Sequence, residues 1–179
     1  MLTGAVAFAA TNLDDLVLLA AFFADRSYRP RSVVAGQYAG IALLYGASAA
    51  AAFAAWVIPQ GYIALLGLLP IAIGVAKLRE ASDSKKALPR TGSLFSVAAV
   101  TVANGGDNVA VYVPVFATRA LADVLIIGAV FAVMTALWCY AASRLVFHPG
   151  WGHAIRRHGR RAVPWVLIAL GAWILLGGG

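Results

Sequence analysis

The chain has 179 residues, of which 62% are hydrophobic and only 12% are charged. Soluble domains usually carry about a quarter charged residues, which their water-facing surface requires. The mean hydropathy of +0.85 therefore indicates an all-α integral membrane protein and excludes a water-soluble globular one. The formal net charge is +7, but in a membrane chain its distribution among the loops tells more than its size, and no nucleic-acid partner is expected.

Cys139 is the only cysteine, so a single chain can form neither a disulfide, a redox pair nor a thiolate cage around a metal. The first apolar segment has no Lys or Arg before it and contains Asp14 and Asp15. A cleavable secretory signal has a basic start and an uninterrupted apolar core. We therefore expect this segment to be a retained transmembrane helix.

Six apolar segments have about the length that a membrane-spanning helix needs, roughly 20 residues. Only Pro59, Gln60 and Gly61 separate the second segment from the third. Pro164 lies at the start of the last segment, where a proline suits the first turn of a helix because that turn does not use its N–H. The predicted spans are residues 3–24, 32–57, 61–78, 93–117, 123–147 and 163–177.

Basic residues are concentrated in the first, third and fifth of the five loops, whereas the second loop has none and the fourth only Arg119. Lys and Arg favour cytoplasmic loops. This predicts that the odd-numbered loops are cytoplasmic and that both termini lie outside. The residues assigned to the odd loops are Arg26, Arg29, Arg31, Lys77, Arg79, Lys85, Lys86, Arg90, Arg144, Arg156, Arg157, Arg160 and Arg161.

The polar stretch 79–92 is predicted to be a cytoplasmic linker between two three-helix repeats, residues 1–78 and 93–179. Because each half has three spans, the second half enters the membrane from the opposite side, as in the inverted repeats of transporters.

The two halves also share a sequence motif, because TNLDDLVLLAAFFA (11–24) resembles NGGDNVAVYVPVFA (104–117). One register pairs Asp14 with Asp107, and a register one residue different pairs Asp15 with Asp107 instead. Both registers place acids and amides at a similar depth in each half, and both remain open.

Three carboxylates, Asp14, Asp15 and Asp107, fall near the middle of predicted spans. A charged side chain at the bilayer centre costs about 2.5–3.5 kcal/mol even on the lenient insertion scale. No Lys or Arg is expected deep in any span. The carboxylates are therefore predicted either to be protonated or to bind a cation.

In the first helix, Thr11, Asn12 and Asp15 share one face, while Asp14 points about 100° away. In the fourth, Asn104, Asp107 and Asn108 share a face, with Thr101 one turn earlier.

Gly105 and Gly106 lie inside the second polar set, where a pair of glycines weakens or kinks a helix and frees carbonyl oxygens as ligands. Pro114 predicts a second break in the same helix, since it removes a backbone hydrogen bond.

Carboxylate, amide and carbonyl oxygens are ligands for hard or intermediate divalent cations such as Ca²⁺, Mn²⁺ or Mg²⁺. We hypothesise that metal and protons compete for the three carboxylates, so that protons are the coupling ion. Gln37, in the segment GQYAG, either reaches this site or belongs to a packing surface made by Gly36 and Gly40. Met134 and Cys139 are expected to pack rather than to bind metal. The additional candidate ligands are Thr11, Gln37 and Thr101.

The segments TNLDDLVLLAAFFA, GQYAG and NGGDN resemble the cadmium resistance transporter (CadD-like) family, part of the lysine exporter superfamily of small six-helix exporters. LLGLLPIAIGVAKL and VLIALGAWILL extend the resemblance along nearly the whole chain. It implies a multi-pass protein of a prokaryotic cell (inner) membrane that exports Cd²⁺ or related divalent cations as substrate and needs no cofactor. Carried over residue by residue, it implies a metal site of Asn12, Asp14, Asp15, Asn104, Asp107 and Asn108.

Other functions remain as alternatives. An intramembrane aspartyl protease would use two acids on different helices, but its GxGD pattern fails here because Asn104 replaces the first glycine. We therefore expect no enzymatic activity. An exporter of small amino acids would want a basic group in the core, which the sequence does not indicate. A passive channel and a homo-oligomer are both compatible with the sequence.

Overall fold

The computed structural model describes residues 2–54, 62, 64–79, 92–146 and 149–176, with side chains described throughout except in 149–161. Within these ranges the protein is helical and contains no strand, which confirms the predicted all-α class. The elements are α1 (Leu2–Ala24), α2 (Pro30–Ala54), the 3₁₀ turn η2 (Ala64–Gly67), α4 (Leu68–Arg79), α5 (Leu94–Asn104), α6 (Gly106–Ala117), α7 (Leu121–Leu145) and α8 (Pro149–Leu175).

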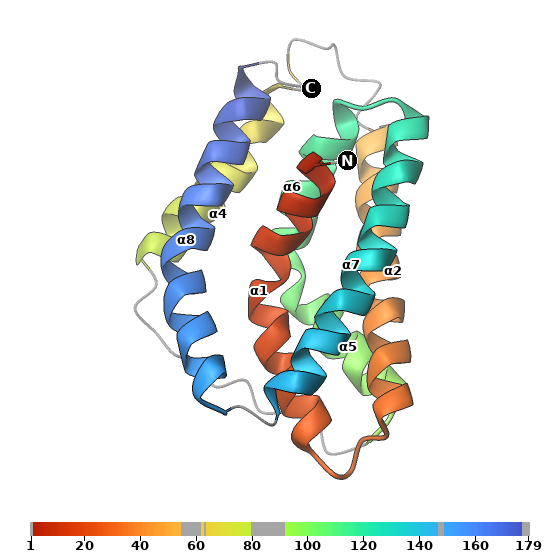
Figure 1. Ribbon diagram of the computed structural model, residues 1–179. Coiled ribbons are helices and arrows are strands. Elements are labelled where there is room, and N and C mark those ends of the chain that lie inside the picture. The colour runs from red at the N-terminus through yellow and green to blue at the C-terminus, as the bar shows by residue number, and fades with distance from the viewer. Residues whose placement is uncertain (1, 55–61, 63, 80–91, 147–148, 177–179) are drawn as a thin grey trace.

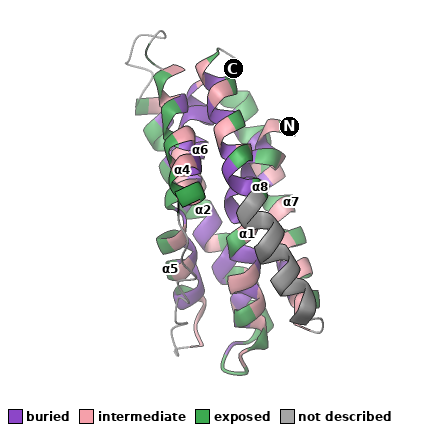
Figure 2. Cartoon of the chain, turned by 90° about the vertical axis from the view of Figure 1, so that its left-hand side faces the viewer, coloured by how far each residue is buried: buried purple, intermediate pink, exposed green. Residues whose placement is uncertain are grey.

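The helices form an elongated bundle in which α1 and α6 are central (Figure 1). Helices α4 and α8 pack together on one side of them, while α2 and α7 lie on the other, with α5 packed against α2. Buried residues line the inward sides of the helices (Figure 2). Two chain segments far apart in sequence, α1 and α6, therefore meet in the middle of the bundle.

Three helices, α1, α2 and α7, are long and apolar enough to cross a membrane. The pair α5 and α6 makes a fourth if the two are one span bent by 67° at the break between them. Helix α4 has only 12 residues, and the apolar part of α8 is also short. The described residues of the six predicted segments are almost all helical, but by length and composition only three or four membrane spans are identified among them.

The bend between α5 and α6 lies at Gly105, as the glycine pair predicts. The predicted second break at Pro114 is wrong, because α6 continues through this residue to Ala117. A proline withholds a single N–H donor, and the remaining hydrogen bonds of α6 maintain the helix around it.

The last helix is longer than predicted. It begins at Pro149, so the basic segment 149–161 is helical rather than a loop, and Pro164 lies inside the helix rather than in its first turn. The first-turn preference of proline is met by Pro149 instead. The residues between the second and third predicted spans, and most of the linker 79–92, lie outside the described residues.

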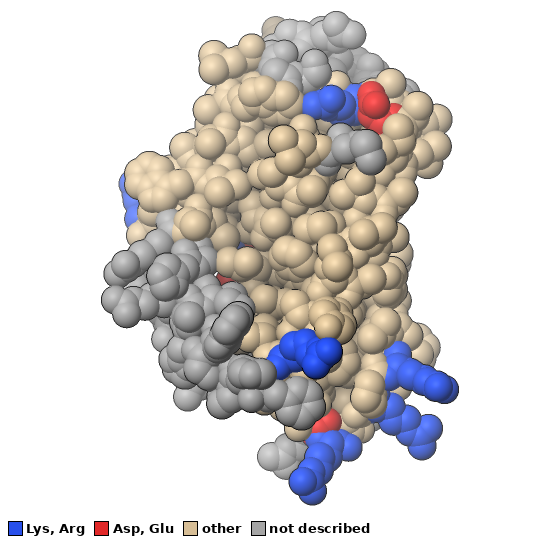
Figure 3. All heavy atoms as spheres, in the orientation of Figure 1, with Lys and Arg blue, Asp and Glu red and all other residues tan. Residues whose placement is uncertain are grey.

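Exposed arginines gather at one end of the bundle, the lower end of Figure 1, where α1 connects to α2 and α7 ends (Figure 3). The middle of the face shown in Figure 3 consists almost entirely of uncharged residues. This places the first and fifth predicted loops at the same end. The arginines described there are Arg26, Arg29, Arg31 and Arg144.

Helices α2 and α5 approach closely through glycines of the GQYAG segment. A Cβ atom added to Gly36 would lie 2.5 Å from the backbone oxygen of Leu94, and one added to Gly40 would lie 2.6 Å from Cβ of Thr101. Neither neighbour can move without shifting α5. The glycines therefore serve helix packing, as one of the two readings of this segment predicted.

Replacing Gly36 with Ala is expected to destabilise the protein, because the added methyl group meets backbone rather than a flexible side chain. Overpacking of this kind costs about 1–3 kcal/mol, which corresponds to a fall in melting temperature of about 3–10 °C for a chain of this size. Gly46 is the matched control, because it lies on the same helix with nothing within 4 Å of an added Cβ. Thermal unfolding in detergent should show a lower melting temperature for Gly36→Ala than for Gly46→Ala, and equal values would contradict the close packing.

Candidate cation site

A polar band crosses the bundle at the middle of α1, between two apolar clusters. One cluster includes Ala7 and Phe8, and the other includes Leu16 and Leu19. The residues between them, 11–15, contain four of the predicted site residues. The polar side chains thus lie near the middle of the helix rather than at its ends.

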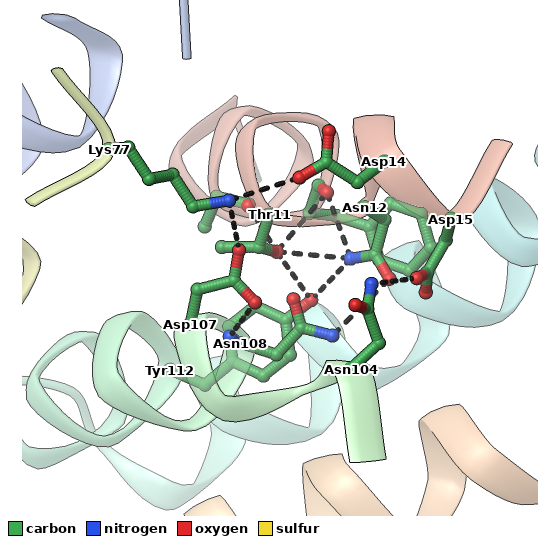
Figure 4. Close-up of polar contacts among 11 residues, drawn as sticks. Thr11, Asn12, Asp14, Asp15, Lys77, Asn104, Asp107, Asn108 and Tyr112 are labelled. Carbon is green, nitrogen blue, oxygen red and sulfur yellow. Dashed lines mark hydrogen bonds and ion pairs between the residues drawn. The ribbon is translucent and has the colours of Figure 1, made fainter. Parts of the chain in front are cut away.

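Asn12 is the centre of a buried hydrogen-bond network and is 0% exposed. Its amide nitrogen has two hydrogens and lies within hydrogen-bonding distance of three acceptors: the Tyr112 hydroxyl at 2.8 Å, the Phe8 carbonyl at 2.9 Å and Thr11 Oγ1 at 3.0 Å. Its amide oxygen accepts a hydrogen bond from Asn108 Nδ2 at 3.3 Å. Asn12 and Asn108 are therefore brought together, and Thr11 belongs to the same network (Figure 4).

Tyr112 is a member of this network that the sequence analysis missed. Its hydroxyl also lies 3.1 Å from Thr11 Oγ1, and its ring packs against Phe131 with 4.5 Å between centroids. A second missed contact joins the Trp138 indole N–H to the backbone oxygen of Asn12 at 2.7 Å. The position of Tyr112 one helical turn after Asn108 is the signal that could have identified it.

Asp15 is 3% exposed, and its carboxylate accepts a hydrogen bond from Asn104 Nδ2 at 2.7 Å. Gln37 accepts one from the Thr101 hydroxyl at 2.7 Å. Gln37 and Thr101 line, together with Asp15, a narrow crevice with no room for a water molecule; its other lining residues are Leu18, Leu19, Phe22 and Val100. The structure thus brings two of the three predicted additional ligands, Gln37 and Thr101, to the Asp15 side of the band.

Asp14 and Asp107 share a basic partner, Lys77. Its ammonium nitrogen lies 3.1 Å from Oδ2 of Asp14 and 2.8 Å from Oδ2 of Asp107. Figure 4 shows the lysine reaching from α4 between the two carboxylates. The prediction that these acids lack an internal basic partner is wrong.

The assignment of Lys77 to a cytoplasmic loop fails because α4 is short. The helix ends at Arg79, about halfway down the bundle in Figure 1, so its last turn lies beside the middle of α1. The four methylene groups of a lysine then carry the ammonium inward to the acids. Two carboxylates and one ammonium leave this triad with a net charge of −1 when all are ionised.

The three acids differ in their surroundings. The side chain of Asp14 is 56% exposed, whereas that of Asp107 is 10% exposed. Asp107 also accepts a hydrogen bond from the backbone N–H of Asn108 at 3.1 Å. Asp14 therefore faces away from Asp15 and is the accessible member of the ion-pair triad, as the 100° offset along α1 predicts.

No three His, Cys, Asp or Glu side chains of the described residues come together in a metal-ligand cluster. The acids form an Asp14–Asp107 pair, with Asp15 apart from it beside Asn104. An amide oxygen adds to the oxygen ligands available, because Oδ1 of Asn108 is buried without a hydrogen-bond partner in the part of the chain that the structure describes. Buried acceptors of this kind are rare, and a cation can satisfy them.

The sulfur atoms in the bundle pack in apolar surroundings. Cys139 is 4% exposed and lies in the cluster that contains Leu16 and Leu19. Met134 packs against the other cluster. Both lie as predicted, and the side chains gathered in the polar band bear oxygen and nitrogen only.

Comparison with known proteins identifies the family. A family model described as "Cadmium resistance transporter" matches residues 8–179, which include every residue of the polar band from Thr11 onward. No similar protein was found among curated proteins or among solved structures. Because the match covers nearly the whole chain, the protein belongs to the cadmium resistance transporter family.

Proposed function

We propose that the protein exports divalent metal cations, with Cd²⁺ the favoured substrate, and that Asp14 and Asp107 are the principal ligands. One observation carries the proposal: the carboxylates of these two residues already converge on a single positive charge, the ammonium of Lys77, at 3.1 and 2.8 Å. They come from helices in different halves of the chain. A position that holds the lysine ammonium between two carboxylates is also suited to a metal cation.

The neighbouring amides support this assignment. Asn108 follows Asp107 directly and offers a buried oxygen that accepts no hydrogen bond from any of the described residues. Asn12 and Asn104 hold Asn108 and Asp15, respectively, by hydrogen bonds. Oxygen ligands bind Cd²⁺ less tightly than thiolates do, which favours release, and they also suit harder cations such as Mn²⁺.

The packing of the helices supports the proposed inverted repeat. If the first repeat consists of α1, α2 and α4, its counterparts are the α5–α6 pair, α7 and α8. In this pairing, the contact of α1 with α7 corresponds to the contacts of the α5–α6 pair with α2. The contact of α1 with α8 corresponds in the same way to the contact of α6 with α4. Contacts between α4 and α8, and between α2 and α7, join counterparts directly. A two-fold axis in the membrane plane, passing near the Asp14–Asp107 pair, would produce this pattern.

Protons are the proposed coupling ion, moving inward as the metal leaves. A carboxylate that loses a divalent cation in a membrane interior must regain positive charge from a proton or from a neighbouring cation, because an unpaired anion is costly there. Proton exchange at the acids meets this need. It also distinguishes an exchanger from a passive channel.

Lys77 removes one argument against an exporter of small amino acids, because it is a basic group inside the bundle. Both of its ion-pair partners are carboxylates of the protein, however, so its charge is already matched. The family match also favours a metal. We retain metal export as the function and treat amino acids as a comparison in the test.

Metal uptake into inside-out membrane vesicles tests the proposal. Vesicles containing the wild-type protein are offered Cd²⁺, Zn²⁺, Mn²⁺, Mg²⁺ and small amino acids in turn, with and without an imposed pH gradient. We expect accumulation of at least one divalent metal that increases with the gradient. Absence of any metal-dependent flux would contradict the proposed function, and flux unaffected by the gradient would contradict proton exchange alone.

A further inference from the structure

Lys77 occupies the position between Asp14 and Asp107 that the proposed function gives to the substrate. Its ammonium contacts one oxygen of each carboxylate, and its side chain is 23% exposed. The residue lies in the last turn of α4, two residues before that helix ends at Arg79. Lys77 thus holds α4 to α1 and to α6 through a single charged group.

A divalent cation and the ammonium cannot share this position. Both would lie within contact distance of the same two oxygens, where like charges repel strongly in an environment of low dielectric constant. The lysine side chain has four rotatable methylene groups and sits at a helix end, so the ammonium can withdraw without movement of the helices. Metal entry therefore requires that Lys77 leave the two carboxylates.

The reverse movement follows when the metal departs. The ammonium is tethered to the bundle and remains close to the carboxylates, so its effective concentration there is high, in the millimolar range or above. Its return neutralises one of the two negative charges that the metal leaves behind. Rebinding of the metal from the outer side is correspondingly weakened.

We propose that Lys77 is a built-in competitor of the transported cation, which lowers the affinity of the Asp14–Asp107 site and accelerates release of the metal. This inference rests on the proposed function. It assigns Lys77 a role in setting affinity and turnover, in addition to any role in stability. The competitor is a side chain of the protein itself, so it acts in every transport cycle.

Two substitutions of Lys77 in the full-length protein test the proposal, with Arg79→Met as the matched control. Arg79 is the next basic residue of α4, is exposed and is two residues from Lys77. Lys77→Met removes the charge and keeps the apolar stem, and it is expected to tighten equilibrium binding of Cd²⁺ by about tenfold or more while slowing metal export. Lys77→Arg keeps a positive charge beside the acids and should bind Cd²⁺ more weakly than Lys77→Met does, whereas Arg79→Met should bind Cd²⁺ with nearly the wild-type affinity. Equal or weaker Cd²⁺ binding by Lys77→Met would overturn the proposal.

A second measurement uses the wild-type protein and does not depend on how the variants fold. The chain has only three lysines, Lys77, Lys85 and Lys86, so labelling with an amine-specific reagent can be followed at each by mass spectrometry. Addition of Cd²⁺ is expected to increase labelling of Lys77 severalfold and to leave the other two unchanged. Unchanged labelling of Lys77 in protein that binds Cd²⁺ would overturn the proposal. Failure of the wild type to bind or transport any metal would instead contradict the proposed function.

Discussion

Replacing Asp107 with Asn is expected to abolish metal export while leaving the helical fold in place. The change removes a carboxylate that is 10% exposed and contacts Lys77 at 2.8 Å, and asparagine has nearly the same size. Removing one charged partner of a buried ion pair weakens binding by about 2–5 kcal/mol, so the affinity of the site for the metal should fall by roughly 30-fold to several thousandfold. Metal accumulation in inside-out vesicles should fall close to that of vesicles without the protein.

Asp123→Asn is the control for this experiment. Asp123 lies in the first turn of α7, is exposed, and is outside the polar band. Its neutralisation changes the net charge by the same amount and should leave metal export unaltered. If Asp107→Asn exports metal at the same level as Asp123→Asn, the Asp107 carboxylate does not bind the substrate.

Replacing Asn12 with Ala is expected to cause the largest loss of stability among the polar substitutions. The change removes the amide nitrogen, whose two hydrogens face three acceptors, and the oxygen that accepts from Asn108, all within a site that is 0% exposed. A buried polar group left without a partner costs about 1–3 kcal/mol, and loss of the side chain leaves a small cavity in addition. We expect the melting temperature in detergent to fall by about 5–10 °C.

Ser143→Ala provides the comparison for Asn12→Ala. The Ser143 hydroxyl donates one hydrogen bond to the Tyr140 carbonyl at an exposed site, where water can replace the serine. Its removal should change the melting temperature little. If both variants unfold at the same temperature, the network around Asn12 contributes no more to stability than an exposed hydroxyl.

Much of the fold could be predicted from the apolar segments alone. A helix in a membrane must form its backbone hydrogen bonds within itself, so each span corresponds to one apolar segment of similar length. The predicted span 3–24 corresponds to α1, and the glycine pair predicted the bend between α5 and α6. Helical spacing also separated Asp14 from Asp15, which point to different partners in the structure. Helix extent, the bend and the angle between neighbouring side chains all depend on residues close together in the chain, so the sequence could predict them.

Lys77 and Tyr112 could not be predicted in the same way, because both act across helices. Lys77 looks like a loop residue when hydropathy is read along the chain, and only the short length of α4 places it beside α1 and α6. Tyr112 looks like an apolar packing residue until its hydroxyl is seen to meet Asn12. Long side chains with one polar end are poorly described by patterns of burial, since the stem and the end lie in different environments.

Titration of Cd²⁺ into the purified wild-type protein, with Asp14→Asn, Asp107→Asn and Asp123→Asn in parallel, tests most directly whether the two carboxylates bind the substrate. Isothermal calorimetry reports both the affinity and the number of ions bound. Wild type and Asp123→Asn are expected to bind one Cd²⁺ per chain with the same affinity, and binding should be lost or weakened by about 30-fold or more in both Asp14→Asn and Asp107→Asn. Unchanged binding of Cd²⁺ by both of these variants would contradict a cation site between Asp14 and Asp107.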